Sequence, residues 1–174
     1  TMRVLLILLG MLWMKGENPS ELIITKQKIT VSGQTSFGAF NCDYTQVGLK
    51  DTLVLNARGI QKAMRFQIPV RDFSCGNFLL NKDFRSTIKA EKYPVCEVQV
   101  GNFKTQNGEI LCDMTVLLVG KKLEFPNLKL HQSQHGLFTE LRLSFDRLEL
   151  QPPNKLGGLV KVEENLDLEV LLGF

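Results

Sequence analysis

The sequence predicts an all-β protein, a closed antiparallel barrel of about eight strands with one short helix. Apolar and polar residues alternate along most segments after residue 20, which is typical of strands with one buried face. Only the segment 81–94 shows a clear helical spacing. A flat sheet of about eight strands would leave two unpaired edges, and closure into a barrel removes them.

The helix is predicted within residues 81–93. Asn81 is suited to cap its start, because its side-chain oxygen can accept a hydrogen bond from a free N–H of the first turn. Phe84 and Ile88 lie four apart and therefore share one face. Pro94 is expected to end the helix and to favour an extended Tyr93.

Four strands are expected before this helix, over residues 21–32, 35–42, 50–56 and 63–70. Gly33 would end the first strand. Gly38, in the middle of the second, indicates a bulge or a sharp bend. Pro69 places the fourth at a sheet edge or at a strand end, because proline donates no backbone hydrogen bond.

The strands after the helix follow the same two-residue period. The first begins at Cys96, and Asn107-Gly108 predicts a two-residue hairpin into a return strand over 110–119. Further strands are expected over 123–130, 137–145 and 165–172, with a loop of paired prolines and glycines at 152–158.

The composition indicates a globular domain without a nucleic-acid surface. The chain is 44% hydrophobic and 22% charged, which argues against disorder and against a coiled coil. Arg3 and Lys15 account for most of the net charge of +3, since 19 basic and 18 acidic residues remain after residue 16. The remaining basic residues are scattered, so we expect no nucleic-acid partner.

Residues 1–20 have the pattern of a signal peptide. A basic start precedes an apolar run over residues 4–14, and a polar segment follows. The run is well short of the roughly 20 residues that cross a bilayer. We expect export to the periplasm or beyond, with an uncleaved anchor and a buried core helix as the alternatives. Residues 21–174 would form the barrel domain, with no stable membrane span.

The predicted inward faces are almost entirely apolar, so an open lumen would take an apolar guest. A barrel of about eight strands has room for packed side chains or for one small ligand. Plain core packing is the alternative at every position, because phenylalanine and methionine fill gaps in any core. The candidate lumen residues are Phe66, Ile68, Phe84, Ile88, Val98, Met114, Val116 and Leu143.

Four cysteines in an exported chain suggest disulfides, with three connectivities open. Cys42 and Cys75 both lie at strand ends beside loops and are the favoured pair. Cys96 and Cys112 would both face inward, but a two-residue turn at Asn107-Gly108 separates them in register. The alternative is that all four are small buried side chains.

No catalytic or metal-binding pattern is recognisable. His131 and His135 are the only histidines, and they lie at an expected strand end and loop without neighbouring ligands that would complete a metal site. The sequence contains no phosphate-binding or dinucleotide-binding loop and no nucleophile turn. We therefore expect a protein that is not an enzyme and that uses no metal and no cofactor.

Several segments together resemble the YceI-like family, lipocalin-like bacterial proteins implicated in binding polyisoprenoids. The resemblance runs from about Ile29 to the C-terminus and rests on the order of TSFGAFNC, FQIPVRDFSCGN, NKDFRSTIKAEKYP, MTVLLVGKKLEF and KVEENLDLEVLL. It implies a lipocalin-type barrel, exported to the periplasm, with an isoprenoid or similar amphiphilic lipid along its apolar lumen.

The expected function is therefore an exported binding protein for an isoprenoid-like lipid. The alternative is a packed barrel that acts as a protein-interaction or structural module without a lipid. Apolar residues on the expected outer face, namely Leu111, Leu117 and Val119, would favour this alternative. A homodimer is compatible with both. A continuous apolar cavity would favour the lipid carrier.

Overall fold

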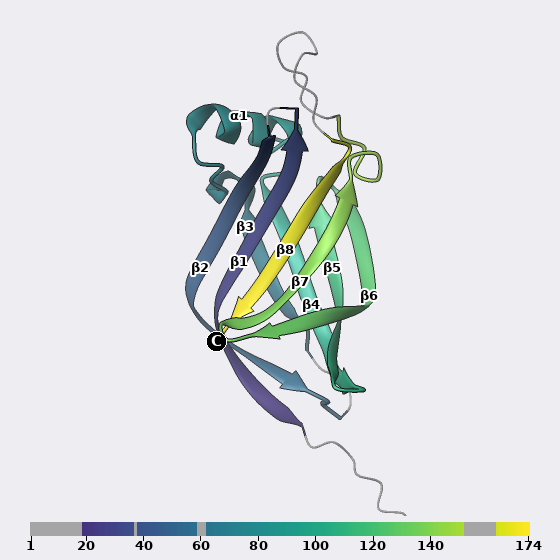
Figure 1. Cartoon of the computed structure of the whole chain (residues 1–174). Helices are drawn as coiled ribbons and strands as arrows, with labels where there is room; N and C mark the ends of the chain where they lie inside the picture. The colour runs from purple at the N-terminus through teal and green to yellow at the C-terminus, as the bar shows by residue number, and fades with distance from the viewer. Residues whose placement is uncertain (1–18, 37, 59–61, 152–162) are drawn as a thin grey trace, which may run out of the picture.

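Eight antiparallel strands form a nearly closed barrel with one α-helix at one end, as predicted (Figure 1). This computed structural model describes residues 19–36, 38–58, 62–151 and 163–174. The strand order is β2-β1-β8-β7-β6-β5-β4-β3. The elements are β1 (Ser20–Thr35), β2 (Gly38–Leu55), β3 (Met64–Pro69), the 3-10 turn η1 (Val70–Asp72), α1 (Phe78–Thr87), β4 (Val95–Gln106), β5 (Glu109–Leu118), β6 (Lys121–Ser133), β7 (Gly136–Ser144) and β8 (Asn165–Gly173).

β2 is one strand where the sequence predicted two, over 35–42 and 50–56. It pairs with β1 from Thr35↔Gly38 to Ser20↔Leu55, with one register shift beside Thr25. Pairing with a long partner holds the intervening residues extended although their own pattern does not alternate. Gly38 begins β2 with a φ of 125° instead of interrupting a strand, and the positive φ within β2 belongs to Gly48.

The turn signals after the helix gave the correct register. Asn107 and Gly108 both have positive φ, at 52° and 78°, and Gln106 lies opposite Glu109. β3 lies at one end of the sheet order and ends at Pro69, where the missing N–H costs no ladder bond. A two-residue turn thus positions the β4–β5 pair.

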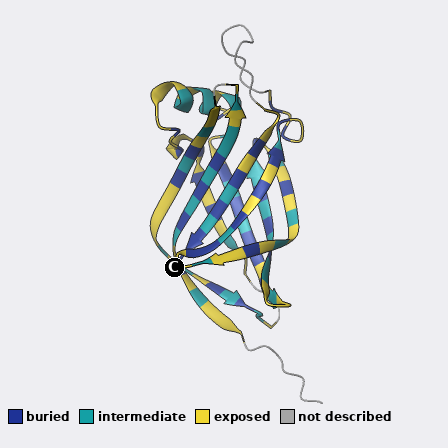
Figure 2. Ribbon diagram, in the orientation of Figure 1, coloured by how far each residue is buried: buried dark blue, intermediate teal, exposed yellow. Residues whose placement is uncertain are grey.

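The core fills the barrel, and burial alternates along the strands (Figure 2). Among the described residues only Gln27 and Thr139 are buried polar side chains. The Gln27 amide Nε2 donates to Gln46 Oε1 over 2.8 Å. Val119 was expected on the outer face but is buried, because it adopts a φ of 53° in the β5–β6 turn and leaves the strand alternation.

β2 and β3 end the sheet order, and the contacts that close the barrel between these two edges lie along a line that we call the seam. Near α1, Asp43 and Ser74 exchange two backbone hydrogen bonds of 2.9 Å, and a disulfide joins Cys42 to Cys75. Towards the opposite end, Asn56 N–H donates to the Phe103 carbonyl over 2.9 Å. These contacts join β2 and the residue that follows it to the segment after η1 and to β4, and they nearly close the barrel.

Candidate functional site

The site lies under α1, whose start differs from the prediction. Asn77 is the N-cap, and its Oδ1 accepts from Leu80 N–H over 2.9 Å. Asn81, the predicted cap, lies within the helix, and its Oδ1 accepts from Cys75 N–H over 2.6 Å. Either asparagine suits a cap, but Gly76, with a φ of 90°, turns the chain immediately before Asn77. The helix therefore begins with three apolar residues at 78–80.

The helix also ends earlier than Pro94, at Thr87. Ile88 is the C-cap, and Lys89 follows with a φ of 53°. Ala90 N–H then donates to the Arg85 carbonyl over 2.9 Å, which closes the end of the helix locally. The cap geometry ends α1 without the proline, and it leaves Ile88 only 4% exposed, facing the barrel.

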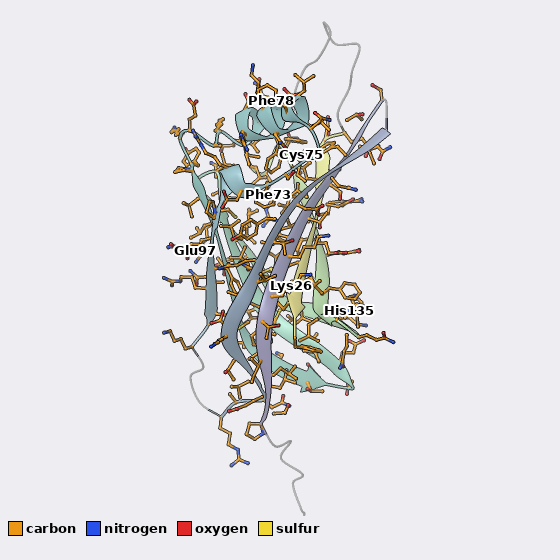
Figure 3. The ribbon with its side chains drawn as sticks, turned by 90° about the vertical axis from the view of Figure 1, so that its left-hand side faces the viewer. Lys26, Phe73, Cys75, Phe78, Glu97 and His135 are labelled. Atoms are coloured by element: carbon orange, nitrogen blue, oxygen red, sulfur yellow. A yellow bond between two sulfur atoms is a disulfide. The ribbon has the colours of Figure 1, made fainter. Side chains whose placement is uncertain are left out.

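The segment before α1 fastens the helix to β2. The Cys42–Cys75 disulfide, the pair favoured from the sequence, joins β2 to this segment. Phe73 is buried between Tyr44 on β2 and Phe84 on α1, with ring centroids 5.7 and 5.3 Å away. Figure 3 shows Phe73 beneath the helix and Phe78 on its far side. One side of α1 therefore packs on the barrel and the other faces outward.

An apolar cavity of about 40 Å³ lies between α1 and the barrel core. Its wall includes six of the eight predicted lumen residues, namely Ile68, Phe84, Ile88, Val98, Val116 and Leu143. Phe66 and Met114 are buried, at 4% and 1% exposure, and do not line this cavity. The two-residue period places them on the inward face but does not give their depth in the barrel.

Sequence reasoning missed eight further lining residues. Several of them belong to the same alternating runs, so their inward direction was readable, but their shared depth was not. Val70, the last residue of the predicted strand 63–70, and Phe73 lie in the connection after β3. The eight are Ile29, Val31, Val70, Phe73, Cys96, Leu118, Leu166 and Leu168.

The cavity wall carries no charge. Cys96 is its most polar side chain and is a free thiol. Burial, with a smaller contribution from the negative charge of Glu97, raises the pKa of Cys96 to about 12, so the thiol is neutral at physiological pH. A ligand in such a cavity would be selected by shape and apolar contact, and the wall offers no group for acid–base chemistry.

Larger hollows with polar and charged side chains in their walls lie on the outer surface of the barrel. Two of them, about 450 and 320 Å³, run over the outward residues of β1, β7 and β8 and share Ser32, Arg142 and Asp167. Arg142 Nε donates to Asp167 Oδ1 over 2.9 Å on this surface. Charged, solvated walls do not suit an apolar chain.

The two histidines are far from a metal-binding arrangement. His131 lies on β6 with its ring centroid 5.3 Å from that of Phe138, and His135 lies in the β6–β7 turn. Over the described parts of the chain, no three His, Cys, Asp or Glu side chains are grouped so as to hold a metal ion. Within the same parts, no helix has the length and apolarity needed to span a membrane.

The fold resembles that of solved structures. A solved polyisoprenoid-binding domain from Saccharophagus degradans, implicated in plant cell wall breakdown, is similar with a TM-score of 0.57. The match covers 85% of this chain and 96% of that one, at 10% sequence identity.

Structures of the Campylobacter jejuni YceI protein are also similar. A mutant with a monobromobimane guest has a TM-score of 0.47 at 12% identity, over 62% of this chain and 68% of that one. Another YceI structure has a TM-score of 0.43 at 12% identity, over 62% and 71%. No family model and no curated protein matches the sequence. The chain has a YceI-like fold, and at these identities the likeness is one of fold.

Proposed function

We propose that this chain is an exported binding protein that holds an isoprenoid-like or other amphiphilic lipid in the cavity beneath α1. The observation that carries the proposal is the cavity wall, in which every lining residue is apolar or a neutral thiol. The fold shared with a polyisoprenoid-binding domain supports it. The absence of an ionised group from the cavity wall supports binding over catalysis.

Uptake requires α1 to move. An apolar cavity of about 150 Å³ holds one benzene, whereas this cavity measures about 40 Å³. No residue within Phe78–Thr87 is fully buried, so the helix is held mainly by partly buried side chains such as Phe84. Displacing Phe84 and Ile88 would open the lumen at the α1 end of the barrel. The disulfide at Cys75 would keep the helix attached to β2.

Apolar burial supplies the driving force. Each methylene removed from water contributes about 0.8 kcal/mol, so one five-carbon isoprenoid unit would contribute roughly 4 kcal/mol. Two or three such units would offset the cost of displacing a helix that has no fully buried residue. The ligand class is therefore one with a long unbranched or methyl-branched apolar chain.

The decisive experiment is a native mass spectrum of the full chain, expressed with residues 1–20 in a bacterial host and purified from the periplasm without detergent. The expected spectrum shows an added mass that organic extraction removes and that fragments as an isoprenoid. Loss of about the first twenty residues would support export. An apo spectrum, together with no binding of added quinones and polyprenols, would refute the lipid carrier.

A matched pair of variants tests the location of the ligand. Val98 lines the cavity and Val100, two residues along the same face of β4, does not, although both are at most 1% exposed. Val98→Phe should fill the cavity and abolish lipid uptake, whereas Val100→Phe should retain uptake in the folded fraction. Thermal unfolding of both variants reports any loss of fold. Equal uptake by the two variants would place the ligand elsewhere.

The alternative is a packed barrel that binds a protein partner. The small volume of the cavity favours it, as do exposed apolar side chains such as Val47, at 71% exposure. The outer positions expected from the sequence give it little support, because Val119 is buried and Leu111 and Leu117 are half-buried. Sedimentation velocity on the apo chain would show whether it forms a homodimer.

A further inference from the structure

The side of α1 that faces away from the barrel is apolar at its start. Phe78 and Leu79 are 77% and 69% exposed, and both belong to the first turn of the helix. Lys82 and Ser86 follow at helical spacing and are also exposed. We call these four residues the outer face of α1. Figure 3 shows Phe78 at the end of the barrel where α1 lies, on the side of the helix away from Phe73.

The segment that carries the outer face has a net positive charge. Residues 71–92 contain five basic and three acidic residues, whereas the rest of the chain after residue 16 contains 14 basic and 15 acidic residues. The exposed cations in this segment are Arg71, Lys82, Lys89 and Lys92, and the exposed acids are Asp72 and Glu91. The outer face itself contains no acidic residue.

The neighbouring β5–β6 turn adds no net charge at this end of the barrel. Lys121 pairs with Glu149 over 2.8 Å, and Lys122 pairs with Glu124 over 2.6 Å. The excess positive charge therefore belongs to the segment that carries the helix. Two large exposed apolar side chains on a segment with an excess of cations match an anionic lipid surface, which accepts apolar groups below its headgroups and attracts cations above them.

We propose that the outer face of α1 docks on an anionic phospholipid bilayer, with Phe78 and Leu79 inserted among the lipids. Docking would place the helix that covers the cavity against the membrane, so that a lipid chain passes between the two without crossing water. This transfer step rests on the proposed function, whereas the docking itself does not. A second copy of the chain is a competing occupant that the test distinguishes.

Bromolipid quenching of a single tryptophan tests the insertion. Trp13 is the only tryptophan in the chain, so a Trp13→Phe, Phe78→Trp double variant reports on the outer face alone. We expect its emission to shift to the blue and to be quenched by vesicles of brominated phosphatidylcholine containing phosphatidylglycerol. Neutral vesicles or raised salt should weaken the effect, because salt screens surface charge.

The matched control carries Val47→Trp in the same Trp13→Phe background. Val47 is 71% exposed, close to the 77% of Phe78, and it lies on β2 opposite Lys26, which Figure 3 shows well away from α1. Its tryptophan should stay unquenched even if the N-terminal segment binds the vesicles. Equal quenching at the two positions, or none at position 78, would overturn the proposal. A blue shift that grows with protein concentration without vesicles would also overturn it, in favour of a second copy.

Replacing Phe78 and Leu79 measures how much these two side chains contribute to vesicle binding. Phe78→Ser with Leu79→Ser should lower partitioning into the anionic vesicles by at least about tenfold, since each side chain buries a large apolar surface. The same variant should still bind polyprenol added from ethanol, as judged by native mass spectrometry. Loss of vesicle binding with retained polyprenol binding separates docking from the cavity. Vesicle binding by a wild-type chain that takes up no lipid would refute the proposed function alone.

Discussion

At the scale of single residues, the two free cysteines show how strand register decides chemistry. Cys96 and Cys112 both face the core, yet the hairpin places Glu97 opposite Leu117 and Cys112 opposite Leu128 on β6. The two sulfurs therefore lie at different levels of the barrel and remain thiols. Inward direction alone would have made them a reasonable pair.

Their burial predicts chemical protection. The pKa of each thiol is raised to about 12, mainly by burial and secondarily by a neighbouring carboxylate. An unfolded cysteine titrates near 8.5, and only the thiolate reacts. At pH 8 we expect no fast reaction of the folded chain with Ellman's reagent and two reactive thiols after denaturation in guanidinium. Rapid reaction of either thiol in the native chain would contradict the burial.

Asp113 predicts an acid-sensitive contribution to stability. Its pKa is lowered, first by the hydrogen bond from the Asn102 amide over 2.7 Å, then by Asn127 N–H over 2.9 Å. Because the folded pKa lies below the unfolded value near 3.9, this stability is present above that pH and is lost as pH falls through the folded pKa.

Replacing Asp113 should therefore flatten the acid side of the stability profile. We expect the free energy of unfolding of Asp113→Asn to decrease less than that of the wild type between about pH 5 and 3. Urea denaturation at each pH measures it. Asn102→Ala should reproduce part of the flattening, and parallel profiles for all three proteins would show that the contact contributes nothing.

At the scale of elements, α1 depends on one side-chain hydrogen bond at its start. Replacing an asparagine N-cap by alanine costs about 1 kcal/mol. Asn77→Ala should lower stability by about that amount and speed hydrogen exchange in residues 78–87, while Asn77→Asp, which keeps the acceptor, should change little. If the cap were Asn81, as the sequence suggested, Asn77→Ala would leave exchange in the helix unaltered.

The disulfide is the second fastening of this element. It joins residues separated by 33 positions, and closing a loop of that length contributes about 3–4 kcal/mol in the chain-entropy account. A Cys42→Ser, Cys75→Ser variant should lose roughly this much free energy of unfolding in guanidinium. If α1 moves during uptake as proposed, this double variant should also take up lipid faster, because α1 is then held to β2 by Phe73 and backbone contacts. Unchanged stability would show that other contacts dominate at the seam.

At the scale of the whole molecule, the barrel is nearly closed, and its seam is the weakest line. β8 is paired with β1 on one side and with β7 on the other, whereas β2 is paired along its length with β1 alone. The register shift in the β1–β2 pair lies beside the middle of β2. Local opening should therefore begin along this edge.

Hydrogen exchange tests whether the barrel opens first along β2. Peptides covering residues 44–50 should exchange markedly faster than peptides covering Asn165–Gly173, because the β8 amides bond to strands on both sides. Lipid binding under α1 should slow exchange in residues 78–90 more than in residues 44–50. Uniform exchange across both strands would indicate that the barrel opens as one unit.

Much of the barrel could be predicted from local patterns. The alternation around Ile68 and Val98, the turn at Asn107-Gly108 and the edge position of Pro69 are all present in the structure. The helix was predicted in the correct region but with the wrong ends. Its true cap is followed by apolar residues, which looked like part of the preceding loop, and Pro94 lies well beyond its last turn.

The sequence by itself determined which face of each strand points inward, because a side-chain period of two is a local property of extended backbone. It also determined the tight hairpin, because the two positive φ values depend on residues that tolerate them. Only the tertiary structure decided that β2 is one strand, that Phe66 and Met114 lie away from the cavity while Ile68 lines it, and that the cavity is small. Continuity, depth and volume depend on register between distant segments, and no local pattern encodes that register.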